Sequence, residues 1–221
     1  INSKAINFVE KLSKDLNIDC QFRRLPAYLF TSDPYFESQL QEEYELYKRL
    51  SIDCSYEKDI PVPLSIQGAL KMNNQAQFHP KRFADAIAEE AEKNGARIFE
   101  DTRVINFEPG EICRVDLENG RHITAGNVII ASHFPCYDGK GFYSARMRAD
   151  RSYIVAIEMD SFPDAHFINI EKPTISLRYI PEEKILLISG ESHKTGHQDS
   201  NHYESLKELA REIFNNGNVK Y

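Results

Sequence analysis

The chain has 221 residues, of which 41% are hydrophobic and 28% are charged, an ordinary balance for a soluble globular protein. Its formal net charge of −7 and the lack of a basic stripe argue against a nucleic-acid-binding surface. No apolar run approaches the roughly 20 residues of a membrane-spanning helix, so we expect no membrane span.

The first third of the chain predicts two helices and two strands. An apolar stripe at helical spacing predicts a helix over residues 1–16. Residues 20–31 resemble a strand with a break at Pro26. Ser32, Asp33 and Pro34 then form a cap followed by proline, which predicts a helix to about Leu50. A short strand is expected over residues 68–72.

The middle third predicts a long helix followed by short strands. The helix spans residues 80–94, with Pro80 at its start and Gly95 after its end. Strands are expected at 97–99, 102–108, 112–117 and 121–124, and Asn119-Gly120 is a strong hairpin signal. The continuously apolar residues 128–131 predict a strand buried on both faces of a parallel sheet.

The last third is mostly β. Strands are expected at 152–159, 174–180 and 185–189, before a final helix over about 203–214. The result is a mixed α/β fold whose segments alternate between two layers, which favours interleaved domains. The expected buried strand ends in Ala131, Ser132 and His133, and ligands of open α/β sheets bind at the carboxyl ends of such strands.

Several strings together resemble a known family. The segments QAQFHP, NGARIFEDTRVINFE, ENGRHITAGNVIIASH and YDGKGFYSARMRADRSYIVA are similar to the middle of the D-amino-acid-oxidase-like (DAO) FAD-dependent oxidoreductases. PTISLRYIP and LLISGESHKTGHQD resemble a branch of that family that often carries a C-terminal Rieske iron–sulfur domain. The resemblance implies part of a Rossmann-like FAD-binding domain interleaved with a mixed or antiparallel substrate sheet.

The resemblance also implies a division of the chain and a cofactor. It predicts a bridging helix at 1–17, substrate-domain segments at 18–78 and 136–221, and a partial FAD-binding domain at 79–135. Val104, Ala131, Ser132 and His133 match family positions near FAD, although Ser132 and His133 replace the usual Thr and Gly. No GxGxxG loop is present, so we expect an internal fragment that binds FAD weakly or not at all.

On the substrate side, alternation along 174–180 places Arg178 on a face with polar groups, where a guanidinium could clamp a carboxylate. The family often has an arginine where this chain has Glu182. Gln77 and His79 lead back to the cofactor domain, and Tyr143 and His193 are further candidates for the substrate pocket. A solvated arginine and core tyrosines are the plainer alternatives.

We therefore expect part of a cytoplasmic flavoenzyme that oxidises a small amine or amino acid, with an iron–sulfur centre as a possible electron acceptor and a homodimer as a possible assembly. The catalytic residues stay unknown, because no side chain is a compelling general base. The alternative is a non-catalytic α/β domain that binds a ligand or protein. A zinc hydrolase using His193, His197 and His202 is disfavoured because Gly196 interrupts them and no HExxH glutamate is present, so we expect no metal site.

Overall fold

A computed structural model describes residues 2–134, 136–137, 141–196, 201–215 and 218–220. The chain forms two compact units. Unit 1 comprises Ile1–Ala84 and Asp150–Tyr221, and unit 2 comprises Asp85–Ala149. Unit 1 is therefore built from two segments that flank unit 2 in the sequence. The structural boundaries fall a few residues beyond the expected division at 78/79 and 14 residues beyond that at 135/136.

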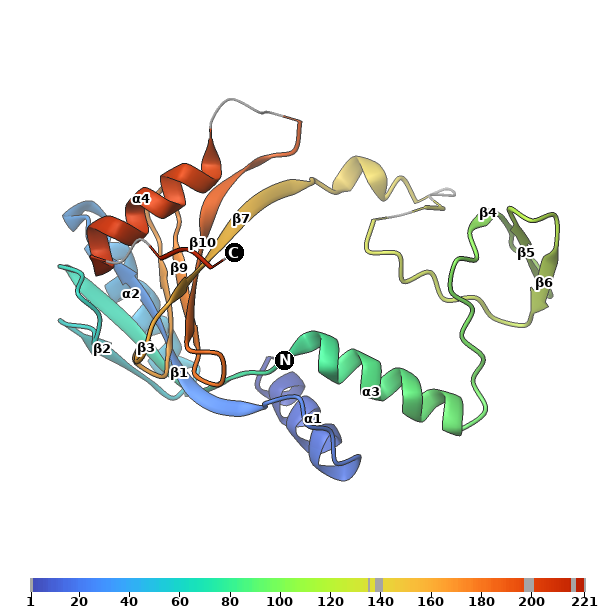
Figure 1. The fold of residues 1–221 in the computed structure, drawn as a ribbon, viewed down its shortest axis with the longest axis horizontal. Coiled ribbons are helices and arrows are strands. Elements are labelled where there is room, and N and C mark those ends of the chain that lie inside the picture. The colour runs from blue at the N-terminus through green and yellow to red at the C-terminus, as the bar shows by residue number, and fades with distance from the viewer. Residues whose placement is uncertain (1, 135, 138–140, 197–200, 216–217, 221) are drawn as a thin grey trace. The chain divides into compact units, whose positions relative to one another are not determined.

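Unit 1 is organised around a seven-stranded mixed sheet with the strand order β2-β3-β1-β8-β9-β10-β7 (Figure 1). Its strands are β1 (Arg23–Thr31), β2 (Cys54–Glu57), β3 (Gly68–Gln77), β7 (Asp150–Glu158), β8 (His166–Asn169), β9 (Ser176–Ile180) and β10 (Ile185–Lys194). β1 and β8 pair in parallel, and the other neighbours are antiparallel. The pairing of β1 with β3 shifts register between Leu25 and Ala27, where the sequence predicts a break at Pro26.

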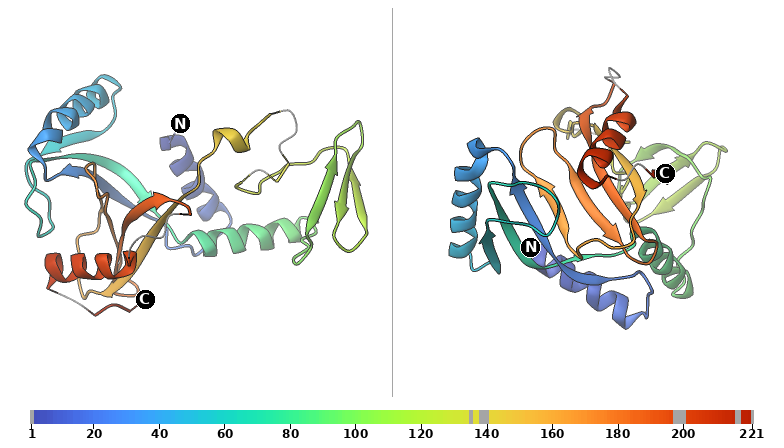
Figure 2. Two further views of the ribbon diagram at one scale, coloured as in Figure 1. Left: turned by 90° about the horizontal axis from the view of Figure 1, so that it is seen from above. Right: turned by 60° about the vertical axis from the view of Figure 1, so that its left-hand side comes forward.

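One face of this sheet carries the core of unit 1, and we call it the packed face. Tyr28, Phe167, Leu177, Ile188 and Val155 are successive cross-strand neighbours on it, and all are buried. Tyr28 stacks on Phe167 with ring centroids 5.0 Å apart. The helix α4 (His202–Phe214) covers β7 and β10 with its buried Leu206 and Ala210 (Figure 2).

The opposite face, which we call the site face, has a different composition. Its central row contains Ala27, His166, Arg178, Leu187 and Ala156 in cross-strand register. Strand alternation explains the difference, because each of these residues neighbours a residue of the packed face along its strand. The prediction that Arg178 lies on the other face from Leu177 and Tyr179 is confirmed, since both neighbours are buried and Arg178 is exposed.

The helix α2 (Glu37–Arg49) begins after a short 3-10 turn, Pro34–Phe36. Asp33 caps this turn by accepting a hydrogen bond from the backbone N–H of Tyr35 at 2.9 Å. α2 packs against β2 and β3 through the fully buried Leu40. The predicted cap and helix are confirmed.

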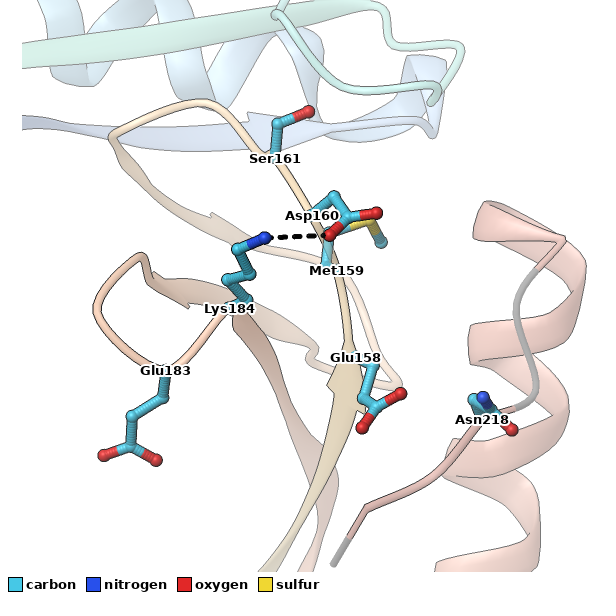
Figure 3. A pocket seen from close by; sticks show the side chains of 7 residues that line it. All are labelled: Glu158, Met159, Asp160, Ser161, Glu183, Lys184 and Asn218. Atoms are coloured by element: carbon cyan, nitrogen blue, oxygen red, sulfur yellow. Dashed lines mark hydrogen bonds and ion pairs between the residues drawn. The ribbon is translucent and has the colours of Figure 1, made fainter.

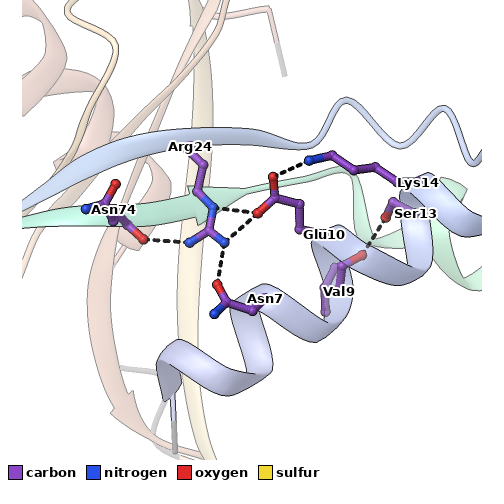
Figure 4. Close-up of polar contacts among 7 residues, drawn as sticks. All are labelled: Asn7, Val9, Glu10, Ser13, Lys14, Arg24 and Asn74. Carbon is purple, nitrogen blue, oxygen red and sulfur yellow. Dashed lines mark hydrogen bonds and ion pairs between the residues drawn. The ribbon is translucent and has the colours of Figure 1, made fainter.

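The helix α1 (Asn2–Asp15) is attached to the sheet through Arg24 on β1 (Figure 4). The Arg24 guanidinium donates to Glu10 Oε2 from Nε at 2.9 Å and to Asn7 Oδ1 from Nη2 at 2.6 Å. It also donates to the backbone oxygen of Asn74 on β3 at 2.9 Å. Burial in α1 is otherwise slight, because only Ser13 is buried among its described residues.

The helix α3 (Pro80–Lys93) begins with a set of local contacts that its sequence encodes. Pro80 occupies the first helical turn, where its missing N–H costs nothing. The ring nitrogen Nδ1 of His79 accepts from the backbone N–H of Arg82 at 3.3 Å. Phe78 and Phe83 pack edge to face with centroids 5.3 Å apart, as in a hydrophobic staple. The predicted helix and its proline start are confirmed.

Unit 2 contains a three-stranded antiparallel sheet of β4 (Val104–Glu108), β5 (Cys113–Leu117) and β6 (His122–Ala125). Gly120, with a φ of +80°, closes the predicted hairpin between β5 and β6. The strand expected at 97–99 is not formed. The prediction for 128–131 is also wrong: these residues form no strand, and Ile129 is 91% exposed.

The failure at 128–131 has a physical reason. A strand buried on both faces requires hydrogen-bonded neighbours and covering layers, and the described residues supply neither at this position. The run is apolar as the sequence shows, but Ile129 and Ile130 remain exposed in the structure, so the predicted burial is wrong as well as the predicted strand. Two short strands, β2 and β8, were not predicted from the sequence.

Candidate functional site

A pocket of about 260 Å³ opens in unit 1 at the end of β3, beside β9 and the start of β10. Three of the residues predicted for a substrate site, Gln77, His79 and Arg178, line it together. The lining residues are Gln21, Arg23, Gln77, Phe78, His79, Pro80, Arg178, Ile180, Glu182 and Leu187. The structure therefore brings together side chains that are 99 positions or more apart in the sequence, from residue 77 or 79 to residue 178.

Arg178 is the most distinctive group of this pocket. It lies directly opposite His166 on β8 and Leu187 on β10. Among the described residues, no carboxylate forms an ion pair with it and no side chain accepts a hydrogen bond from it. The pocket partly desolvates the guanidinium, which lowers the pKa of Arg178. A cation that is partly removed from water and has no counter-ion is an electrostatic site for an anion.

His166 lies beside Arg178 and is half-buried. Its Nε2 is 2.9 Å from Oε1 of Gln77. Burial, followed by the positive charges of Arg178 and Arg23, lowers the pKa of His166 to about 4. The imidazole is therefore neutral at physiological pH, and it adds no positive charge to the site. Sequence reasoning missed His166 because β8 itself was not predicted.

Arg23 supplies the second guanidinium of the pocket. Its Nη1 donates to Asp164 Oδ1 at 2.9 Å, so part of its charge is compensated. Its Nε and Nη2 are buried without a hydrogen-bond partner. Glu182 is the acidic residue of the lining. The pocket thus holds two guanidinium groups, of which Arg178 is the one without a carboxylate partner.

The other predicted substrate residues lie elsewhere or have structural contacts. His79 caps α3 through Nδ1, which commits that nitrogen to the helix start. Gln77 uses its amide oxygen for His166 and its amide nitrogen for the backbone oxygen of Tyr179 at 3.1 Å. Tyr143 belongs to unit 2, where it is 56% exposed.

His193 belongs to a stack of rings at the end of β10 and the start of α4. Its Nδ1 lies 2.9 Å from the backbone oxygen of Lys194, and its Nε2 lies 3.1 Å from the Tyr153 hydroxyl. The rings of His193 and His202 stack with centroids 4.5 Å apart, and Glu191 lies 3.0 Å from Nδ1 of His202. These contacts give His193 a defined place in packing, without Arg178 as a neighbour.

The histidine pattern considered for zinc is only partly described. His197 lies outside the described residues. Within those residues, no group of three or more His, Cys, Asp or Glu side chains is arranged to hold a metal ion.

Unit 2 contains an apolar pocket of about 360 Å³. Three of the four predicted cofactor-binding residues, Val104, Ala131 and Ser132, line it, while His133 is exposed with a positive φ of 63°. The remaining lining residues are Ile105, Asn106, Phe107, Val115, Val128, Ile129, Ile130, Cys136 and Tyr137. Its apolar walls suit a flat aromatic ring more than a charged group.

A third pocket lies at one end of the unit 1 sheet (Figure 3). It is lined by Glu158, Met159, Asp160, Ser161, Glu183, Lys184 and Asn218. Lys184 Nζ forms an ion pair with Asp160 Oδ1 at 3.3 Å, and both side chains are largely exposed. Solvated charges of this kind contribute little binding energy, so we do not place the functional site there.

The comparison with known proteins decides the family. The whole chain, residues 1–221, matches the family described as FAD dependent oxidoreductase (DAO). The chain belongs to the DAO family of FAD-dependent oxidoreductases. The resemblance seen in the sequence is thereby confirmed, and so is the mixed α/β fold of this family.

The chain is similar to a curated bacterial protein. It is 37% identical over 225 residues to YhfW of Bacillus subtilis (strain 168), which is named as a candidate Rieske 2Fe-2S iron–sulfur protein. The alignment covers 100% of this chain and 44% of YhfW. The chain thus spans less than half the length of this relative.

Two solved structures share the DAO fold. Glycine oxidase from Geobacillus kaustophilus has a TM-score of 0.71 at 17% identity, over 96% of this chain and 60% of that one. L-alpha-glycerophosphate oxidase from Mycoplasma pneumoniae, solved with FAD bound, has a TM-score of 0.67 at 14% identity, over 98% of this chain and 66% of that one. In the described part of this DAO chain, none of the helices has the length and apolar character needed to cross a membrane.

Proposed function

We propose that this DAO-family chain contributes the substrate pocket of an FAD-dependent enzyme that oxidises a small amino acid. The observation that carries the proposal is the Arg178 guanidinium, which lies in a pocket without a carboxylate partner among the described residues. A substrate carboxylate would complete that pairing with charge-assisted hydrogen bonds. Glycine oxidase, a protein of the same fold, is named for an amino-acid substrate.

In this proposal, each residue at the unit 1 pocket has its own role. Arg178 binds and orients the carboxylate, and the apolar Leu187 and Ile180 of the pocket wall exclude water from the substrate. His166 is neutral at physiological pH, because of its lowered pKa, and leaves the guanidinium as the charged anchor. FAD would supply the hydride acceptor when it is bound, and the pocket residues bind and orient the substrate.

A second part of the proposal concerns the apolar pocket of unit 2. Val104, Ala131 and Ser132 line an apolar cavity, and we propose that they contact an FAD ring there. Ile129 and Ile130, which are exposed and also line this pocket, would lose contact with water when the cofactor is bound. We do not propose that these residues bind the FAD pyrophosphate, because the sequence has no GxGxxG loop.

The test uses the protein loaded with FAD. It is mixed anaerobically with glycine, alanine, a simple amine or glycerol 3-phosphate, and bleaching of the flavin absorbance is recorded. We expect bleaching by an amino acid and weaker bleaching by the amine, which lacks the carboxylate. Bleaching by glycerol 3-phosphate alone would contradict the proposal.

Two variants locate the anchor. Arg178→Met should weaken amino-acid binding roughly 10- to 100-fold through loss of a charge-assisted interaction, and Arg178→Lys should weaken it less. Arg49→Met, which removes an exposed arginine of α2, is the matched control and should match the wild type. Equal affinities in Arg178→Met and the wild type would refute the assignment.

We also propose that the electrons leave the flavin for an iron–sulfur centre. The support is the 37% identity to YhfW, whose name refers to a Rieske 2Fe-2S protein. Rapid mixing of the natural protein with substrate in the absence of oxygen should then give reduced iron–sulfur signals by electron paramagnetic resonance. Flavin reduction without any such signal, and rapid oxygen consumption instead, would contradict this second proposal.

A further inference from the structure

The amide of Gln77 has a fixed orientation. One end of it faces the backbone oxygen of Tyr179 at 3.1 Å, and the other faces His166 Nε2 at 2.9 Å. A backbone carbonyl oxygen can only accept, so the end facing Tyr179 is the NH₂ group, which donates. The amide oxygen of Gln77 therefore faces His166.

This orientation determines the tautomer of His166. Because the Gln77 oxygen can only accept, His166 Nε2 carries the hydrogen and donates it. In the neutral imidazole, Nδ1 is then an unprotonated acceptor. His166 Nδ1 has no hydrogen-bond partner among the described residues, yet it is not one of the buried atoms left without a partner, so solvent or a ligand reaches it.

The acceptor lies next to the proposed carboxylate anchor. His166 and Arg178 are directly opposed on the antiparallel strands β8 and β9, and both lie on the site face. Directly opposed residues have Cβ atoms about 4.5–5.5 Å apart. The residues that carry the unprotonated acceptor and the unpaired guanidinium are thus cross-strand neighbours, and the charge of Arg178 acts on His166 by lowering its pKa. His166 lies beside the pocket lining and not in it, so the pairing fits a ligand that holds a carboxylate at Arg178 and extends a hydrogen-bond donor towards β8.

We propose that His166 Nδ1 accepts a hydrogen bond from the α-amino group of the substrate while Arg178 binds its carboxylate. The inference rests on the proposed oxidation of an amino acid and assigns the second point of recognition. It makes His166 a substrate-binding residue and Gln77 a positioning residue, since Gln77 acts by holding the hydrogen on Nε2. No proton is transferred to His166 in this step, and no bond is broken.

The chemistry predicts a particular selectivity. A carboxylate without a donor on the adjacent carbon gains only the Arg178 contact, whereas an α-amino acid gains both contacts. Loss of the acceptor should therefore affect amino acids and spare simple carboxylates. Loss of the guanidinium should affect both classes of ligand.

The test measures dissociation constants in the natural FAD-containing protein from changes in the flavin spectrum. The ligand pairs are glycine with acetate and alanine with propionate, each under anaerobic conditions with the flavin already reduced, so that no turnover occurs. His166→Leu should weaken the amino acids roughly 10-fold and leave the carboxylates within about twofold of the wild type. His166→Asn, whose amide oxygen can replace Nδ1 as acceptor, should restore much of the amino-acid affinity.

A second variant protects the test against a folding defect. Gln77→Met removes the group that fixes the tautomer and leaves His166 in place. It should weaken glycine and alanine by a smaller factor than His166→Leu, again without an effect on acetate and propionate. If His166→Leu does not fold, His166→Asn and Gln77→Met decide the question.

The outcomes separate this inference from the function on which it rests. Equal weakening of amino acids and carboxylates in His166→Leu would mean that His166 only supports Arg178, and would overturn the inference. An unchanged affinity for both would overturn it as well. Failure of every amino acid to reduce the wild-type flavin would instead overturn the proposed function. Absence of binding by all four ligands would overturn both.

Discussion

The two units of the chain use apolar residues in opposite ways. Among the described residues, unit 1 holds all but two of the buried hydrophobic residues, and α4 covers β7 and β10 on the packed face. Within the part of unit 2 that the structure describes, only Cys113 and Leu117 are buried, while isoleucines such as Ile129, Ile112 and Ile105 are more than half exposed. An apolar sequence pattern therefore produces a core only where another element of the same unit packs over the apolar side chains.

The contrast also separates two kinds of pocket. In unit 1 the pocket presents Arg178, a charged group without a carboxylate partner among the described residues, on an interior strand of a well-packed sheet. In unit 2 the pocket is lined mainly by apolar side chains. A stable sheet positions a polar anchor accurately, whereas an exposed apolar surface favours association with a large apolar partner.

The largest expected effect breaks the core of unit 1. Phe167→Ala should lower the free energy of unfolding by about 3–5 kcal/mol, because Phe167 is 1% exposed and its loss leaves a cavity beside Tyr28. Urea unfolding followed by circular dichroism measures the change. The matched control, Ile129→Ala in unit 2, should stay within about 0.5 kcal/mol of the wild type. Similar losses in both variants would contradict the contrast between the units.

An intermediate effect concerns pH. The folded protein holds the pKa of His166 at about 4, below its value of 6.5 in the unfolded chain. Between these values the unfolded state binds a proton that the folded state does not, so the contribution of His166 to stability is complete above pH 6.5 and is lost as the pH falls towards 4. His166→Gln should reduce this pH dependence in urea unfolding at pH 4 to 7.

Two identical pH profiles would contradict the lowered pKa. Carboxylates also titrate in the lower part of this range, so the comparison is the difference between variant and wild type at each pH, and not the slope of either protein alone.

The smallest expected effect concerns the attachment of α1 to the sheet. Arg24→Ala removes the hydrogen bonds to Glu10, Asn7 and the backbone of Asn74, which attach this otherwise exposed helix to the sheet. Amide hydrogen exchange in α1 should become about 3- to 10-fold faster, while exchange in β9 and β10 stays unchanged. Lys11→Ala, on the exposed side of the helix, is the control. Faster exchange in the central strands would show that the network supports the whole sheet.

Much of the fold could be predicted from the sequence, because its signals are local. Pro80 and the Phe78–Phe83 pair specify the start of α3, and Asn119-Gly120 specifies a hairpin. The short strands β2 and β8 escaped prediction, since four residues carry too little periodicity. The apolar run at 128–131 was misassigned as a strand because its pairing depends on partners that local sequence does not reveal.

The site was predictable only in part. Alternation along β9 placed Arg178 on the correct face, because strand periodicity is local. The role of Gln77 as the partner of His166 depends on a pairing 89 residues apart in sequence, which no spacing rule predicts. Neutral His166 was missed for the same reason, since its pKa is set by burial and by Arg178 and Arg23 in the folded sheet.

The most direct test of the central claim is a crystal structure of the natural FAD-containing protein with a bound substrate carboxylate, such as glycine on the reduced flavin. We predict that the carboxylate lies within hydrogen-bonding distance of the Arg178 guanidinium. A structure in which a protein carboxylate neutralises Arg178, with the ligand bound elsewhere, would contradict the account.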